Sequence, residues 1–292
     1  TLARVGLVDL VGEGDESRIG RSEAELILES CIRCADSLRG DWPWAEAPRL
    51  LVSRPPWLRI KDRFRGHPEG SELRKQLSGS LRGTTESDGS PRFAALRGNV
   101  NLYRLFLERS MKLVQEGGRI RMIVPDALLR EKSSVALRKL MVESNQWVSS
   151  WSFPEPQRVF PGASQGILVI GLTVGGSTEM MTSFGPLEIQ DLSTSTGLDS
   201  KTPFLEMERG PWSVWTDMTW AVPRMPRDSY TRNAVLRAIG ELADQPRLGA
   251  EGNCLNPTDE PIRVRVGEID HTNSSADISH WAPDTTGVHF IS

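Results

Sequence analysis

A pair of consecutive prolines limits what the first part of this chain can fold into. They follow the apolar run Leu50–Val52 and lie in the sequence Arg54-Pro55-Pro56-Trp57. Because proline fixes φ and lacks a backbone N–H, the run is expected to be a buried strand that ends at this turn. Open α/β sheets bind ligands outside the carboxyl ends of their strands, so the sequence predicts a functional site here.

The turn also has a distinctive polar chemistry. Two prolines remove two backbone donors and leave rigid carbonyl groups that only accept hydrogen bonds. Trp57 adds a flat aromatic face directly beside them. Rigid acceptors next to a stacking ring suit a planar group that carries an amine, such as a nucleobase extruded from a duplex.

The turn resembles the Asn-Pro-Pro-Tyr/Phe/Trp signature of N6-adenine DNA methyltransferases. Residues 98–109 (GNVNLYRLFLER) and 117–125 (GGRIRMIVP) are similar to the same family. The resemblance is best to its large single-chain branch, found in restriction-modification and phage-defence systems, and it covers residues 30–175 well. One position departs from the signature, because Arg54 takes the place of the motif's Asn.

The resemblance implies a mechanism and the residues that carry it. In such enzymes an adenine flips out of double-stranded DNA and stacks on the motif's aromatic ring. Its N6 amine donates to the Asn oxygen and to the first Pro carbonyl, and S-adenosyl-L-methionine supplies the methyl group. The implied catalytic residues are Arg54, Pro55, Pro56 and Trp57. A guanidinium has donors and no acceptor, so we expect this chain to be inactive as it stands.

Cofactor binding is the second implied role. The segment Ile32–Leu38 resembles the family strand near the cofactor's adenine, which implies Asp36 and Ser37 as cofactor-binding residues. The alternative is that Asp36 forms an Asx turn or caps a helix. The glycines within 5–14 lie too close to the turn to match the family's glycine loop. We therefore expect a partial chain whose cofactor half is missing or precedes residue 1.

The charge distribution restricts any DNA surface to a local patch. With 35 Lys and Arg against 38 Asp and Glu, the formal charge is −3. Residues 58–97, expected to form a long loop, hold nine basic and five acidic side chains, a balance of +4. Such a loop either holds phosphates beside an extruded base or is simply solvated. The candidate DNA-binding residues are Arg59, Lys61, Arg63, Arg65 and, much later in the chain, Arg263 and Arg265.

Beyond this loop, alternating helical and apolar segments predict an α/β fold with a class I, Rossmann-like methyltransferase sheet. We expect a partial catalytic domain over 1–176, a linker over 177–202 and a partial, mixed α+β target-recognition region over 203–292. The stretch 267–273 resembles the opening of that region. The expected elements are a helix from Asn101 ended by Gly117, a strand 119–124, a helix capped by Ser133, strands 147–153 and 167–174, a helix 229–242 that buries its apolar side chains and a strand 262–266.

Other functional classes find little support. Cys31 and Cys34 form a lone C-x-x-C pair without further ligands at matching spacing, so we interpret both as small apolar residues in a strand and predict no metal site. No apolar run approaches the roughly 18 residues that span a bilayer, and no signal peptide is visible, which predicts a cytoplasmic protein.

These patterns predict an adenine-specific DNA methyltransferase, with double-stranded DNA and further restriction or defence subunits as partners. A non-catalytic DNA-binding module derived from such an enzyme is the alternative from another class. An RNA or protein-glutamine methyltransferase is a further alternative, because those enzymes share the Asn-Pro-Pro-Tyr turn.

Overall fold

The computed structural model describes residues 31–94, 96, 100–154, 165–188, 191 and 202–243, together with Leu26 and Gln245. The chain divides into two compact units, Thr1–Ala243 and Asp244–Ser292. All of the elements below belong to the first unit. The predicted segments 5–14, 262–266 and 267–273, and with them Arg263 and Arg265, lie outside the described residues.

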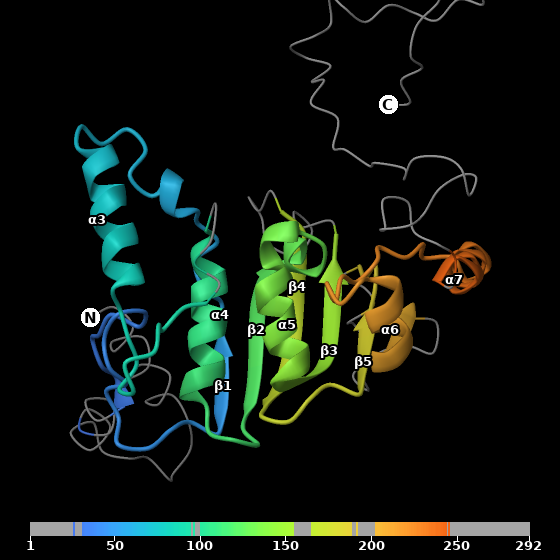
Figure 1. Ribbon diagram of the computed structural model, residues 1–292, viewed down its shortest axis with the longest axis horizontal. Helices are drawn as coiled ribbons and strands as arrows, with labels where there is room; N and C mark the ends of the chain where they lie inside the picture. The colour runs from blue at the N-terminus through green and yellow to red at the C-terminus, as the bar shows by residue number, and fades with distance from the viewer. Residues whose placement is uncertain are drawn as a thin grey trace, which may run out of the picture. The chain divides into compact units, whose positions relative to one another are not determined.

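The first unit is built on a six-stranded mixed sheet (Figure 1). The strand order is β1-β2-β4-β3-β5-β6. Strands β1 and β2 run parallel, β4 is antiparallel to both β2 and β3, and β6 is antiparallel to β5. The strands are β1 (Leu50–Ser53), β2 (Arg119–Pro125), β3 (Asn145–Phe153), β4 (Ile167–Val174), β5 (Met180–Phe184) and β6 (Phe204–Glu208).

Helices α4, α5 and α6 lie along one face of this sheet, whereas α3 stands apart from it (Figure 1). Short 3-10 helices are also present. Helix η1 follows the turn after β1, η2 follows β2, and η3 lies directly before α5. Their bounds are η1 (Ile60–Asp62), α3 (Gly70–Arg82), α4 (Leu102–Leu113), η2 (Asp126–Leu129), η3 (Lys132–Ser134), α5 (Val135–Glu143), α6 (Arg209–Trp215) and α7 (Ser229–Ala243).

The main core lies between the sheet and these helices. In β2 the alternating residues Ile120, Met122 and Val124 are buried, and they belong to the same cluster as Leu107 of α4 and Met141 of α5. This period-two burial is what one covered face of a sheet requires. The predicted α/β class, a sheet with helices packed against it, is confirmed for this part of the chain.

Three tryptophans belong to this core and pack against one another. The ring of Trp212 lies between those of Trp147 and Trp220, with centroid separations of 5.8 and 5.3 Å. Its indole N–H donates to the Ala221 carbonyl at 2.8 Å. The buried indole groups therefore combine apolar packing with satisfied donors, as large aromatic core residues require.

The strands predicted at 119–124, 147–153 and 167–174 are confirmed, but several local expectations are wrong. The run 50–52 forms β1 as predicted but is not buried, because β1 lies at the edge of the described sheet with Leu50 57% and Val52 72% exposed. The basic stretch expected to be a loop contains the 13-residue helix α3. Helix α4 ends at Leu113 with Val114 as its C-cap, whereas Gly117 forms the later turn with φ 75° and donates to the Val174 carbonyl. Ser133 lies within η3 and does not cap α5, because its hydroxyl is engaged by Arg104 and Glu131.

The sheet continues past the predicted domain boundary at residue 176. Strand β5 lies in the range expected to be a linker, and it pairs with β3 and β6. Helix α7 forms close to its predicted bounds, but none of its residues is buried and Leu242 is 67% exposed. Its apolar side chains therefore do not form the expected core contact within the described structure.

The segment before β1 also differs from the expectation. Residues 32–36 do not form a strand, and Ser37–Arg39 form a turn. Cys31 and Cys34 are exposed, and Cys34 lies in no regular element, so they are not buried apolar strand residues. The Asp36 carboxylate accepts from the backbone N–H groups of Leu38 and Arg39, which folds this segment into a turn in place of a strand.

A buried arginine holds the irregular backbone around α5. The Arg138 side chain is 1% exposed and donates to the carbonyls of Leu128, Glu131 and Thr219 at 2.8, 3.0 and 2.8 Å. These carbonyls belong to η2, to the loop before η3 and to the segment after α6. Burial lowers the pKa of this guanidinium to about 10. One side chain therefore satisfies three carbonyl groups that no regular element pairs.

Replacing this side chain is expected to destabilise the protein strongly. Arg138→Met leaves the Leu128 and Thr219 carbonyls without this donor, whereas Glu131 keeps its bond from Ser134 N, and we expect the free energy of unfolding to fall by about 3 kcal/mol. Lys139→Met, at the next position of α5, is the matched control and should change it by less than about 0.5 kcal/mol. Urea denaturation measures both variants. Equal effects would contradict a bridging role for Arg138.

Candidate functional site

The turn after β1 lies at the carboxyl end of two parallel strands, as predicted. Arg54 and Pro56 are exposed, Pro55 is buried and Trp57 is half-buried. Pairing of Ser53 with Met122 is the last in the β1–β2 register, so the turn leaves the sheet at this point. Its rigid carbonyls are therefore presented beside the end of β2.

Trp57 is held from two sides. Its indole N–H donates to the Ile123 carbonyl of β2 at 3.3 Å, and its ring packs against two core clusters. The Arg54 guanidinium lies over the ring, with Cζ 5.3 Å from the centroid, which is cation–π geometry. The Trp57 ring, which the sequence predicts to stack on a base, is therefore in contact with Arg54, the residue that replaces the motif's Asn.

The chain after the turn pairs with the segment that leads into α4. Ile60 N donates to the Val100 carbonyl at 3.0 Å, and Leu102 N donates to the Leu58 carbonyl at 2.9 Å. Between them Arg59 and Asn101 form an antiparallel bridge. This short ladder places the N-terminus of α4 directly across from the residues that follow Trp57.

A cavity of about 480 Å³ opens beside this ladder. It lies between the end of β2, the start of β4, the N-terminal turn of α4 and the loop before α5. A cavity of this size is large enough for a nucleobase and its sugar. Its lining residues are Arg59, Asn101, Tyr103, Arg104, Pro125, Asp126, Ala127, Glu131, Ser133, Gln165 and Gly166.

Charged groups in the cavity wall are mostly paired with each other. Arg104, 3% exposed, forms an ion pair with Glu131 and donates to the Ser133 hydroxyl at 2.7 Å. Asp126 accepts from Arg130 at 2.7 Å and from Arg224 at 3.1 Å. Tyr103 is almost completely buried, and this burial raises the pKa of its phenol. The wall is therefore pre-organised, and Tyr103 stays neutral at physiological pH.

Asn101 provides an acceptor that sequence reasoning missed. Its side chain is 7% exposed, and its Oδ1 is buried without a hydrogen-bond partner among the described residues. Asn101 is the N-cap of α4, yet it makes no capping hydrogen bond. A buried amide oxygen without a donor costs free energy and indicates a position where a ligand can supply the donor. One feature of the sequence could have indicated Asn101, because it stands directly before a predicted helix, where asparagine is a preferred N-cap residue.

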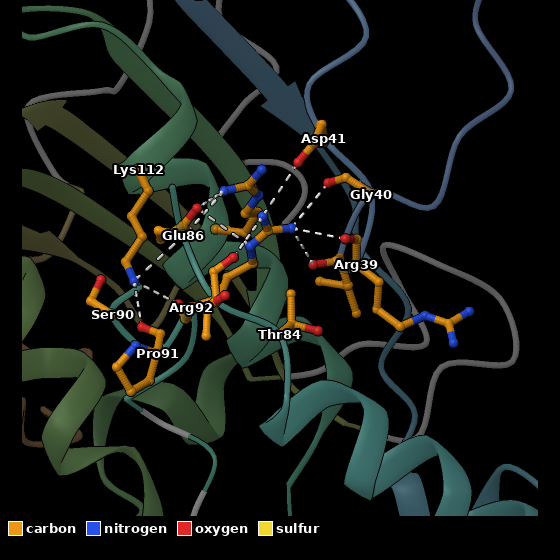
Figure 2. Close-up of polar contacts among 12 residues, drawn as sticks. Arg39, Gly40, Asp41, Thr84, Glu86, Ser90, Pro91, Arg92 and Lys112 are labelled. Carbon is orange, nitrogen blue, oxygen red and sulfur yellow. Dashed lines mark hydrogen bonds and ion pairs between the residues drawn. The ribbon is translucent and has the colours of Figure 1, made fainter. Parts of the chain in front are cut away.

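The predicted cofactor residues Asp36 and Ser37 lie in a turn held by a second arginine network. The Arg92 guanidinium, 4% exposed, donates to the carbonyls of Leu38, Arg39 and Gly40 at 3.0–3.2 Å. Figure 2 shows this guanidinium pointing at the turn, with Glu86 and Lys112 on its other side. The network connects the turn to the loop after α3 and to α4.

The Asp36 carboxylate is occupied within its own turn. Its Oδ1 accepts from Leu38 N and Arg39 N, both at 3.0 Å, and its Oδ2 accepts from Arg39 Nε at 2.7 Å. This is the Asx-turn alternative. A cavity of about 80 Å³ beside Ser37 is too small for S-adenosyl-L-methionine, because cofactor sites measure roughly 300–1,000 Å³. The described residues around Asp36 therefore do not fit that cofactor.

The predicted DNA-binding residues separate into distinct places. Arg59 lines the cavity beside the turn, whereas Lys61 and Arg65 line hollows along α3. Arg63 lies with its guanidinium 5.7 Å from the ring centroid of Phe64. Arg59 therefore lies at the cavity, whereas Lys61 and Arg65 lie beside α3.

The described part of the chain holds neither a cluster of metal ligands nor a membrane-spanning helix. No group of three or more His, Cys, Asp or Glu side chains there could hold a metal ion. Likewise, none of the helices described combines the length and apolar character that crossing a membrane requires.

Residues 55–160 match the Eco57I restriction-modification methylase family. The matched range begins inside the turn, at Pro55, and includes the ladder to Asn101, the helix α4 and strand β2. This part of the chain is therefore similar to a restriction-modification methylase. A comparison with curated protein sequences found no match.

Several solved structures of restriction-modification proteins are similar to the chain. The type IIG restriction endonuclease BpuSI is 17% identical, over 59% of this chain and 20% of that one, with a TM-score of 0.41. The M protein of the type I restriction enzyme EcoKI is 11% identical, over 68% and 49%, with a TM-score of 0.39. A type I methyltransferase subunit from Streptococcus thermophilus is 17% identical, over 72% and 46%, with a TM-score of 0.39. The chain spans less than half the length of each of these proteins.

The Asp36 turn gives a pH-dependent prediction. Partial burial raises the pKa of Asp36, but hydrogen bonds from Arg39 and Leu38 outweigh it, so the pKa lies below its ordinary value of 3.8. A carboxylate with a lowered pKa stabilises the fold above that ordinary value, and this contribution disappears as pH falls through the folded pKa. Asp36→Ala should therefore cost up to about 0.5 kcal/mol at pH 7, because solvent screens this exposed pair.

The difference between wild type and Asp36→Ala should vanish in strong acid. Thermal unfolding from pH 7 down to pH 2 measures it, with Asp41→Ala as the control in the same loop. A difference that stays constant across this range would show that the Asp36 hydrogen bonds do not stabilise the turn.

Proposed function

We propose that this chain carries the target-base part of an adenine-N6-specific DNA methyltransferase of a restriction-modification or phage-defence system. The observation that carries the proposal is the Pro55-Pro56-Trp57 turn at the carboxyl end of β1, which leads within two residues to Arg59. Arg59 lines a cavity of about 480 Å³, whose described lining does not include the turn itself. The match to a restriction-modification methylase family over 55–160 supports it. The proposed partners are double-stranded DNA with a flipped adenine and further subunits of such a system.

The chemistry of the cavity suits an adenine edge. An exocyclic amine donates two hydrogen bonds, and the turn offers proline carbonyls that only accept. Asn101 adds a buried oxygen with no partner among the described residues. An asparagine amide pairs well with the N6 and N7 edge of adenine, and the side chain's oxygen and nitrogen exchange places by rotation of the amide. Asn101 is therefore the proposed acceptor in this chain, in place of the signature's Asn.

Arg54 favours a second candidate function, a non-catalytic DNA-binding module. Its guanidinium covers the Trp57 ring at 5.3 Å and offers donors only. A cation here suits a phosphate better than an amine. S-adenosyl-L-methionine supplies the methyl group in the enzymes that the sequence resembles, but the described residues around Asp36 do not fit it.

Adenine recognition can be tested without knowing the recognised sequence. An unpaired base is less costly to extrude, so a duplex with one A·C mismatch presents adenine to the cavity. The chain should bind this duplex at least about tenfold more tightly than a fully paired one, because stacking on an aromatic ring contributes about 1–3 kcal/mol. Replacing the mismatched adenine by purine without the N6 amine should reduce that preference. Fluorescence anisotropy measures all three affinities.

Two variants assign the preference to the site. Trp57→Leu keeps an apolar side chain in the core and removes the ring, so the preference for the mismatched duplex should disappear. Asn101→Leu should bind the adenine and purine duplexes equally. A wild-type protein that binds all three duplexes with the same affinity would refute adenine recognition.

Arg54→Asn separates the two candidate functions. In an adenine-binding site, the change uncovers Trp57 and adds an oxygen acceptor, and the preference for adenine over purine should rise about fivefold, the effect of one hydrogen bond of about 1 kcal/mol. Arg54→Leu is the control, because it uncovers the ring without adding an acceptor. In a phosphate-binding module, both variants should instead weaken binding to every duplex by about 1–3 kcal/mol. That second result would overturn the catalytic origin of the turn.

A further inference from the structure

One face of α3 carries basic and small polar side chains. At about 3.6 residues per turn, positions 71, 74, 75, 78, 79 and 82 fall on one side of the helix. The side chains there are Ser71, Arg74, Lys75, Ser78 and Arg82, with Gly79 between them. Leu77 and Leu81 point to the other side and pack into a core cluster with Ile60 and Leu105.

This face forms one wall of a groove, which we call the α3 groove. The groove has a volume of about 480 Å³, and Lys61 of η1 lies on its opposite wall. Ile60, Leu96 and Val100 also line it and supply apolar surface. No carboxylate is among its described lining residues.

A second hollow extends the groove along the same track. It has a volume of about 430 Å³, shares Lys61, Ser71 and Arg74 with the first, and adds Arg65 and His67. Asp62 is the acidic residue among the described residues that line it. Cations therefore accumulate along a continuous track in a chain whose formal charge is −3.

The cations of the α3 groove differ from those of an ordinary solvated helix face. Such faces commonly pair bases with acids three or four positions away. In the described structure Glu72 instead accepts from Gln76, and Lys61, Lys75 and Arg82 form no ion pair. Arg74 is held in place by the Gly70 and Lys61 carbonyls at 3.1 and 3.4 Å. The groove thus presents positive charge that no described acid neutralises.

We propose that the α3 groove binds the sugar–phosphate backbone of a DNA strand. Lysine and arginine pair with phosphates, serine hydroxyls donate to phosphate oxygens, and the apolar groups contact the sugars. The described lining of the α3 groove contains no aromatic ring on which bases could stack, so the contact there is independent of sequence, whereas Phe64 and His67 line the second hollow. Ser71 to Arg82 spans about 16 Å of helix, which is long enough for several phosphates at about 3.4 Å of axis each.

The position of the groove relative to the turn supports this assignment. Arg59 lines the cavity beside the turn, Lys61 lines the α3 groove, and only Ile60 separates them. The Ile60 hydrogen bond to Val100 keeps this segment in place. A strand held in the groove would therefore lead directly to the cavity, so the inference rests on the proposed function and identifies where the strand carrying the target base lies.

The test removes the charge of the groove without touching the turn. We combine Lys61→Gln, Lys75→Gln and Arg82→Gln, and the control combines Lys132→Gln, Lys139→Gln and Arg237→Gln, which removes the same charge elsewhere. Affinity for a 30-base-pair duplex is measured by anisotropy between 50 and 200 mM salt. Three lost phosphate contacts should make the negative slope of log K against log salt less steep by about 2.7, at about 0.9 per contact. The control should make it less steep by less than about 1.

A neutral variant checks that shape as well as charge matters. The structure has open space where a Cβ at Gly79 would lie. Gly79→Gln fills the groove and improves helix propensity, so the variant should fold with an unchanged or higher melting temperature. It should bind the duplex about tenfold more weakly, the effect of losing one or two backbone contacts.

The outcomes distinguish this inference from the proposed function. If the triple variant and the control bind equally, the inference is wrong, whereas a persisting preference for the mismatched adenine would leave the proposed function standing. If the triple variant loses affinity but the wild type shows no such preference, the groove is a backbone site and the proposed function fails. Binding through these residues to phosphatidylserine vesicles, without binding to DNA, would overturn the inference.

Discussion

The short ladder between residues 58–60 and 100–102 is the interaction on which the candidate site depends. Two hydrogen bonds, from Ile60 to Val100 and from Leu102 to Leu58, connect the chain after the turn to the start of α4. They place Arg59 and Asn101 at the cavity and Lys61 at the α3 groove. Because α4 packs into the main core, the ladder anchors an exposed turn to the most rigid part of the molecule.

Buried arginines organise the backbone around this core. Arg92 and Arg138 donate chiefly to carbonyl groups, and Arg104 combines a carbonyl, a hydroxyl and a carboxylate. A planar guanidinium with five donors in a fixed geometry can satisfy several irregular carbonyls at once. The protein thus holds its loops near the cavity with polar contacts rather than with regular secondary structure.

The expectations from sequence succeeded or failed for identifiable reasons. Period-two and continuous apolar patterns predicted β2 to β4 because burial of a sheet imposes that pattern. The apolar run before the prolines predicted β1, but the burial expected of it was wrong because β1 lies at the edge of the described sheet. Helix α3 was missed because Arg, Lys, Ser and Gly dominate its sequence, whereas its leucines at 73, 77 and 81 already carry a helical period. Asp36 was assigned to a cofactor by resemblance, but its carboxylate is engaged by Leu38 and Arg39.

The sequence by itself determined the α/β class, the strand that ends at Pro55 and the aromatic residue that follows, because proline geometry and apolar periodicity are local properties. Only the tertiary structure decided what surrounds that turn. The Arg54 guanidinium over Trp57 is a contact within the turn itself. The ladder that places Asn101, whose side-chain oxygen has no partner among the described residues, and the clustering of Lys61 with Lys75 and Arg82 both bring together residues from separate elements. Such contacts depend on how α3 and α4 pack, and no local pattern specifies that packing.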